Sequence, residues 1–163
     1  MSFELTPQMR ARFEREVAKY PEGRQASAVM ACLAIVQQAE GWVSEEAEHA
    51  VAAYLGMPPI AVQEVTTFYN MYNRQPVGRY KLNVCTNLPC ALRGSTEAFE
   101  HLRAKLGVEP YGTSADGNFT LQPCECLGAC ADAPVMLVND REMLSHMSAE
   151  RLDELIDTLK AAR

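Results

Sequence analysis

In the N-terminal half of the chain, apolar residues recur at three- and four-residue steps, which is the spacing of one face of a helix. The first such series consists of Met9, Phe13, Val17 and Tyr20. It follows Thr6-Pro7, in which the threonine can cap a helix and the proline suits the first helical turn. We therefore expect a helix that begins there and ends at the break Tyr20-Pro21-Glu22-Gly23.

The same spacing predicts three more helices in this half. They span about residues 25–40, with Gly41 as the stop, then the segment between Ser44 and Gly56, and then a short segment from Pro58-Pro59 to about Phe68. Helices this short are marginal by themselves in water. They should therefore pack together as a helical bundle.

The pattern changes after the turn-rich segment 73–78, where short runs of β-branched and apolar residues begin. Strands are expected at 80–84, 119–122, 134–139 and 142–144, and helices at 90–106 and after the capping residue Ser148. The order β-α-β-β-β-α predicts a small α/β sandwich. The fold class is therefore α/β, with an N-terminal helical domain at residues 1–77 and a second domain at residues 78–163.

Composition narrows the function. The chain has 163 residues, of which 48% are hydrophobic, and a net charge of −6. An acidic chain with no cluster of Lys and Arg lacks the basic face that nucleic-acid binding requires. The longest weakly polar stretch, residues 26–36, is about half the ~20 residues that cross a bilayer, and the N-terminus does not resemble a signal peptide. A reducing compartment is expected, where grouped cysteines more often serve metal or redox chemistry than disulfides.

The candidate chemistry lies in the cysteines. Cys32 falls among apolar residues of an expected helix, where a single thiol usually packs as a small hydrophobe. The other five form two groups, Cys85-x₄-Cys90 and Cys124-x-Cys126-x₃-Cys130, at the ends of expected elements. Iron–sulfur clusters need four thiolates, commonly supplied from loops that bend around the inorganic core.

Neighbouring residues agree with such a site. Cys90 is expected at a helix N-terminus, where the dipole favours a thiolate, and Pro89 is tolerated there. Arg93 adds positive charge one turn later. Gly128 can adopt a positive φ and leaves room for backbone to approach a cluster.

Other kinds of site stay open on spacing alone. Structural zinc also binds four cysteines, although its usual knuckles are shorter and more regular. A dithiol redox site would use C-x-x-C, and a plant-type ferredoxin C-x₄-C-x₂-C, and neither pattern is present. His49, His101 and His146 have no metal-pair spacing, and no G-x-G-x-x-G loop indicates NADH binding.

The residues around the cysteines resemble a known family. Cys85-Thr-Asn-Leu-Pro-Cys90-Ala-Leu-Arg-Gly and Glu125-Cys126-Leu-Gly-Ala-Cys130-Ala-Asp-Ala-Pro are similar to the two cluster motifs of the thioredoxin-like ferredoxin subunit of respiratory complex I, NADH:quinone oxidoreductase. In the helical half, Ala-Glu-Gly-Trp42 and Glu64-Val-Thr-Thr-Phe-Tyr-Asn-Met-Tyr72 resemble the same family. The resemblance runs from about Tyr20 to Leu159.

This resemblance implies a thioredoxin-like second domain and one [2Fe–2S] cluster bound by Cys85, Cys90, Cys126 and Cys130. It implies that the chain passes single electrons beside the flavin of an NADH-binding partner subunit, as part of an oxidoreductase with no complete active site on this chain. It also implies a peripheral position in a multi-subunit assembly, on the cytoplasmic side of the inner membrane, or on the matrix side in a mitochondrion.

Three questions stay open. Cys124 stands where the family pattern predicts another residue; we expect only one of Cys124 and Cys126 to face a cluster, and the motif favours Cys126. The alternative assembly is a soluble NAD-linked hydrogenase or formate dehydrogenase, and a third, less favoured hypothesis is a zinc-stabilised interaction module. The aromatic run 65–72 serves either inter-domain packing or a subunit interface.

Overall fold

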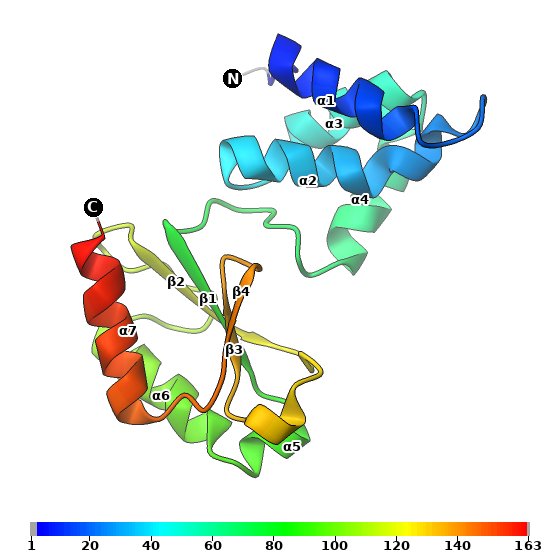
Figure 1. Ribbon diagram of the computed structural model, residues 1–163. Coiled ribbons are helices and arrows are strands. Elements are labelled where there is room, and N and C mark those ends of the chain that lie inside the picture. The colour runs from blue at the N-terminus through cyan, green and yellow to red at the C-terminus, as the bar shows by residue number, and fades with distance from the viewer. Residues whose placement is uncertain (1–2, 163) are drawn as a thin grey trace. The chain divides into compact units, whose positions relative to one another are not determined.

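The computed structural model describes residues 3–162. The chain divides into two compact units, of which the first ends at Pro76 and the second begins at Val77 (Figure 1). The expectation that 1–77 and 78–163 are independent domains stays a prediction. Each unit is described by itself.

The first unit consists of helices joined by short turns. They are α1 (Pro7–Val17), a 3₁₀ turn (Gln25–Ala28), α2 (Val29–Glu40), α3 (Glu45–Leu55) and α4 (Pro59–Phe68). Their ends agree with the expected caps: the Thr6 hydroxyl accepts the Met9 N–H at 3.2 Å and the Ser44 hydroxyl accepts the Ala47 N–H at 3.2 Å. Gly41 and Gly56 end α2 and α3 in the left-handed conformation.

One apolar core holds these helices together. Phe13 and Cys32 are fully buried in it, and the Phe13 ring meets the Tyr54 ring edge-on at 5.1 Å. The first helix is shorter than its apolar spacing predicts. It ends at Val17, and Tyr20 lies beyond it, 40% exposed, because the break at Pro21 already limits the residues before it.

Polar contacts attach the segment that follows α4 to this unit. The buried Glu48 accepts a hydrogen bond from the Thr66 hydroxyl and lies 3.6 Å from the Arg74 guanidinium. The Tyr72 hydroxyl donates to the Met30 carbonyl at 2.9 Å. The chain up to Arg74 therefore packs as part of the helical unit.

The second unit is built on a four-stranded sheet in the order β2-β1-β3-β4. Its elements are β1 (Tyr80–Cys85), α5 (Leu88–Ala91), α6 (Ser95–Leu106), β2 (Phe119–Cys124), a 3₁₀ turn (Cys130–Asp132), β3 (Met136–Val138), β4 (Glu142–Leu144) and α7 (Ala149–Ala161). β1 and β2 are parallel and the remaining pairs are antiparallel. The predicted β-α-β-β-β-α order and α/β class are confirmed.

Three elements differ from expectation. The strand expected at 134–139 is shorter and spans Met136–Val138. The single helix predicted at 90–106 is two helices, because Gly94 adopts a φ of 93° between α5 and α6. The strand predicted at 119–122 continues through Pro123 to Cys124. Leu121 directs its N–H away from β1, to the Gly112 carbonyl at 3.1 Å. Residues two apart along a strand share a side, so the missing N–H of Pro123 lies on that outer edge and costs the β1–β2 pairing nothing.

The two faces of the sheet differ in chemistry. Leu82 and Val84 lie in the core that α6 and α7 cover, whereas Lys81 and Asn83, which alternate with them, do not. On the second face, the Lys81 ammonium lies 2.6 Å from the Asp140 carboxylate, which also accepts the Asn83 side-chain N–H at 2.5 Å.

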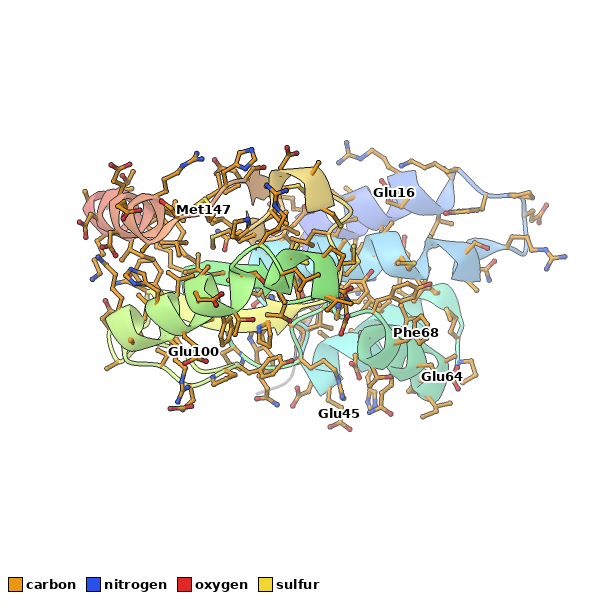
Figure 2. All side chains as sticks on the ribbon, turned by 90° about the horizontal axis from the view of Figure 1, so that it is seen from below. Glu16, Glu45, Glu64, Phe68, Glu100 and Met147 are labelled. Atoms are coloured by element: carbon orange, nitrogen blue, oxygen red, sulfur yellow. The ribbon has the colours of Figure 1, made fainter. Side chains whose placement is uncertain are left out.

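The predicted turns and final helix are also present. Asn139 and Asp140 both have positive φ, as a two-residue hairpin turn requires. The Ser148 hydroxyl accepts the Arg151 N–H at 3.4 Å at the start of α7. Just before it, Met147 is buried against the sheet core (Figure 2).

Truncating one core side chain in each unit tests whether the units are separate domains. Phe13→Ala should destabilise the helical unit by about 3–5 kcal/mol, and Leu102→Ala the second unit by about 2–5 kcal/mol, because each leaves a cavity. Trp42 fluorescence reports on the first unit, and amide exchange of α6 and β1 reports on the second. If either variant loosens both units equally, the two are one cooperative domain.

Candidate iron–sulfur site

The four cysteines expected as ligands lie at one end of the sheet in the second unit. Cys85 ends β1 and Cys90 lies in α5, just after it. Cys126 follows the end of β2, and Cys130 begins the 3₁₀ turn beyond it. Because β1 and β2 are parallel and in register, their carboxyl ends meet at the same edge, which brings the two cysteine groups together.

Apolar packing holds the inner part of this site. Cys85 and Cys90 are each 1% exposed and form a small core with Ala133 and Val135, separate from the main core of the unit. The Cys85 N–H donates to the Val135 carbonyl at 3.1 Å, which attaches the segment after Cys130 to β1. In contrast, Cys126 is exposed and Cys130 is half-buried.

The four thiols form two neighbouring pairs. Cys90 is hydrogen-bonded to Cys85, and Cys130 to Cys126. The two pairs are close together, since charge on Cys130 would raise the pKa of Cys90 and charge on Cys85 would raise the pKa of Cys130. In residues 3–162, no three His, Cys, Asp or Glu side chains surround a single ion position. Two pairs side by side suit a [2Fe–2S] cluster, in which each of the two irons takes two protein thiolates.

Two of these thiols, Cys90 and Cys130, hold their protons more tightly than a free cysteine, contrary to the expectation for Cys90. Burial, followed by the hydrogen bond with Cys85, raises the pKa of Cys90 to about 11. The four-residue helix α5 is too short for its dipole to overcome this desolvation. The hydrogen bond with Cys126 and burial also raise the pKa of Cys130. A metal must therefore displace the protons of Cys90 and Cys130 when it binds.

Backbone geometry around the outer pair agrees with expectation. Gly128 has a φ of 76°, and its N–H points to the Cys126 sulfur at 3.4 Å. Such a donor stabilises negative charge on a ligand sulfur. Arg93 is exposed.

One contact at the site was not foreseen from the sequence. The Asn87 side-chain N–H donates to the Glu125 carboxylate at 2.9 Å, which links the two cysteine-bearing loops. Nothing in the spacing of the two residues indicates this pairing, because it depends on the parallel register of β1 and β2.

Cys124 lies closer to the site than expected. It is half-buried on β2, is paired in register with Cys85, and packs against the small core that contains Cys85 and Cys90. Since the strand ends at Cys124, strand alternation does not relate it to Cys126. The expectation that only one of these two thiols faces the site therefore stays a prediction.

The remaining cysteine and the three histidines lie away from this site. Cys32 was expected to pack in a core, and the histidines were expected to form no metal pair. Cys32 is fully buried in the core of the first unit. His49 is exposed on α3, His101 lies 2.8 Å from Asp153, and His146 is exposed and 3.7 Å from Asp132.

Comparison with known proteins decides the family. The model of the thioredoxin-like [2Fe–2S] ferredoxin family matches residues 13–160, which include both units and all six cysteines. The chain belongs to this family. The resemblance, the thioredoxin-like α/β fold and the [2Fe–2S] cofactor are thereby confirmed, and the structural-zinc alternative falls away.

Individual relatives of this ferredoxin support the same family, and the identities below are those of this chain. It is 41% identical over 151 residues to NADH-quinone oxidoreductase subunit 2 of Thermus thermophilus, covering 92% of this chain and 83% of the relative. It is 40% identical over 154 residues to an NADH-quinone oxidoreductase subunit of Rhizobium meliloti, covering 94% of this chain and 90% of that relative. The expected class, a subunit of an oxidoreductase, is confirmed.

A solved structure extends the comparison. An NAD⁺-reducing [NiFe]-hydrogenase in the H₂-reduced state matches with a TM-score of 0.68 and 25% identity over 79% of this chain. The ferredoxin spans only 22% of that hydrogenase chain. The same fold is therefore found as one part of a much longer polypeptide.

Serine substitution distinguishes the ligand set from the additional thiol. Cys126→Ser should lose or alter the visible absorption and the EPR signal of the cluster, because it removes one thiolate. Cys124→Ser should keep both, because this thiol is not part of the two pairs. The opposite result would exchange the roles of the two cysteines.

The stability of the first unit at alkaline pH tests whether the Cys32 thiol is buried in its core. Burial, then the Glu16 charge, raises the pKa of Cys32 from 9.0 to about 12. The folded unit therefore binds the proton more tightly than the unfolded chain. The associated stability is fully present below pH 9 and is lost as pH rises from 9 toward 12. At about pH 10.5 the loss should be about 2 kcal/mol.

The measurement is guanidinium unfolding followed by Trp42 fluorescence at about pH 8 and about pH 10.5. Cys32→Ala is the matched control, since it is less stable throughout but lacks this titration. Tyr72, whose pKa burial also raises to about 12, titrates in both proteins. If the stability of wild type and of Cys32→Ala depends on pH equally, Cys32 is not the cause of the loss.

Proposed function

We propose that this ferredoxin is the electron-transfer subunit of an NADH:quinone oxidoreductase. It holds one [2Fe–2S] cluster on Cys85, Cys90, Cys126 and Cys130, next to the flavin of an NADH-binding partner subunit. One observation carries the proposal. Cys85 and Cys90 form one thiol pair, Cys126 and Cys130 form another, and the two pairs meet at one end of the sheet.

The residues around the cluster site have different roles. When bound, the cluster supplies a one-electron acceptor. The buried pair, Cys85 and Cys90, excludes water from one side, and the exposed Cys126 leaves the other side open to a partner. The Gly128 N–H stabilises charge at the Cys126 sulfur.

Exposed apolar side chains beside the cysteines support a protein partner. Leu88 and Leu92, which flank Cys90, are 70% and 79% exposed. Apolar side chains at the centre of a polar surface are typical of subunit interfaces. Side chains of this size facing water are otherwise unfavourable, so a partner subunit that covers them would stabilise the assembly.

The aromatic run in the first unit divides into two parts. Tyr72 is buried and packs within the unit, whereas Phe68, near Glu64 on α4, is 79% exposed (Figure 2). Tyr69 and Met71 are also exposed. These three exposed side chains suit either expected role, packing between the units or a subunit interface, whereas Tyr72 already packs within its own unit.

The location follows from the assembly. Within residues 3–162, no helix is both long enough and apolar enough to span a bilayer. As a complex I subunit, the chain would lie peripherally on the cytoplasmic side of the inner membrane, or on the matrix side in a mitochondrion.

The alternative machine is a soluble NAD-linked hydrogenase or formate dehydrogenase. The hydrogenase match, with a TM-score of 0.68, favours it as the second candidate. Residues of this chain alone do not separate the two machines, because the same cluster would accept electrons from the same flavin in both.

Purification of the native assembly tests the proposal. The chain should carry about two iron and two acid-labile sulfide and be brown. It should co-purify with a flavin- and NADH-binding subunit, and NADH should reduce the cluster only when that subunit is present. Co-purifying quinone-reducing subunits support complex I, and a hydrogenase or formate dehydrogenase subunit supports the alternative. A colourless zinc protein would overturn both.

A further inference from the structure

The candidate site contains five thiols rather than four. Cys124 is the fifth, and the two thiol pairs leave it without an assigned role. It is not part of the helical core, unlike Cys32, and it packs in the same small core as Cys85 and Cys90.

The sheet register fixes where Cys124 can act. Cys124 lies directly opposite Cys85 on the neighbouring parallel strand. Neighbouring strands are about 4.8 Å apart, and residues in register direct their side chains to the same face. A tetrahedral metal with metal–sulfur bonds of about 2.3 Å places two of its thiolates about 3.7 Å apart. Small side-chain rotations therefore bring the sulfurs of Cys85 and Cys124 to one metal.

Backbone contacts keep Cys124 in that position. The Thr86 N–H donates to the Cys124 carbonyl at 3.1 Å, directly after Cys85. Cys126 lies outside the strand and is exposed. Cys124 packs against the small buried core that contains Cys85 and Cys90. It therefore neighbours the inner pair of thiols.

We propose that Cys124 is a reserve ligand for the iron that Cys85 and Cys90 hold, and replaces either thiolate when that thiolate is lost. This inference rests on the proposed function, because it assumes the four-cysteine cluster. In the exchange, the bond from iron to the departing sulfur breaks and a bond from iron to the Cys124 sulfur forms. The Cys124 thiol releases its proton to solvent, the departing thiolate takes one up, and no electron is transferred.

Ligand variants with and without Cys124 test this. Cys85→Ala and Cys90→Ala should each retain a [2Fe–2S] cluster with shifted EPR g values, because Cys124 completes the ligand set. Adding Cys124→Ser to either variant should lower bound iron and sulfide at least about tenfold. Cys126→Ala is the matched control at the outer pair, and there the presence of Cys124 should make no difference.

Two results would overturn the inference: loss of the cluster from Cys85→Ala and Cys90→Ala while Cys124 is present, or retention of the cluster after Cys124→Ser is added. Circular dichroism shows whether each variant folds. If neither ligand variant folds, cluster release to an iron chelator from wild type and from Cys124→Ser decides. Release should be several-fold faster without Cys124, and equal rates would reject the reserve role.

The wild-type chain separates this inference from the proposed function. If wild type carries no [2Fe–2S] cluster, the proposed function fails. If wild type and Cys124→Ser both carry the cluster but the ligand variants do not depend on Cys124, only the reserve role fails.

Discussion

The parallel pairing of β1 with β2 is the constraint on which the site depends. Cys85 and Cys126 are far apart in the sequence, and no local contact could bring them together. The in-register pairing from Tyr80 with Phe119 to Cys85 with Cys124 carries both chain segments to the same edge of the sheet. A slip of one residue would turn Cys85 toward the face that α6 and α7 cover and separate the two thiol pairs.

The local features of the fold could be predicted from the sequence because single residues determine them. Thr6 and Ser44 cap helices, Gly41 and Gly56 end them, and Asn139 starts the expected hairpin turn. The spacing of the cysteines indicated a metal site, and the residues between them identified the family before the fold was known. The separation of the chain into a helical part and a sheet part follows from the change in hydrophobic period.

The features that sequence reasoning missed depend on three-dimensional context. Gly94 divides a segment whose apolar spacing suits one helix. Desolvation at Cys90 outweighs a helix dipole because α5 is only one turn long, and the apolar neighbours Ala133 and Val135 that cause this burial come from another part of the chain. The proximity of Cys124 to Cys85 follows from strand register, which the spacing of cysteines along the chain does not contain.

Pro123 has a consequence for how this chain meets other copies of itself. An open sheet edge with free N–H groups can pair with a strand of another molecule and start aggregation. Along the outer edge of β2, the segment around Gly112 already occupies the Leu121 N–H, and Pro123 has none to offer. The sheet edge beside the five cysteines therefore offers few free N–H groups for strand addition, so strand pairing between copies would not bring their cysteines together.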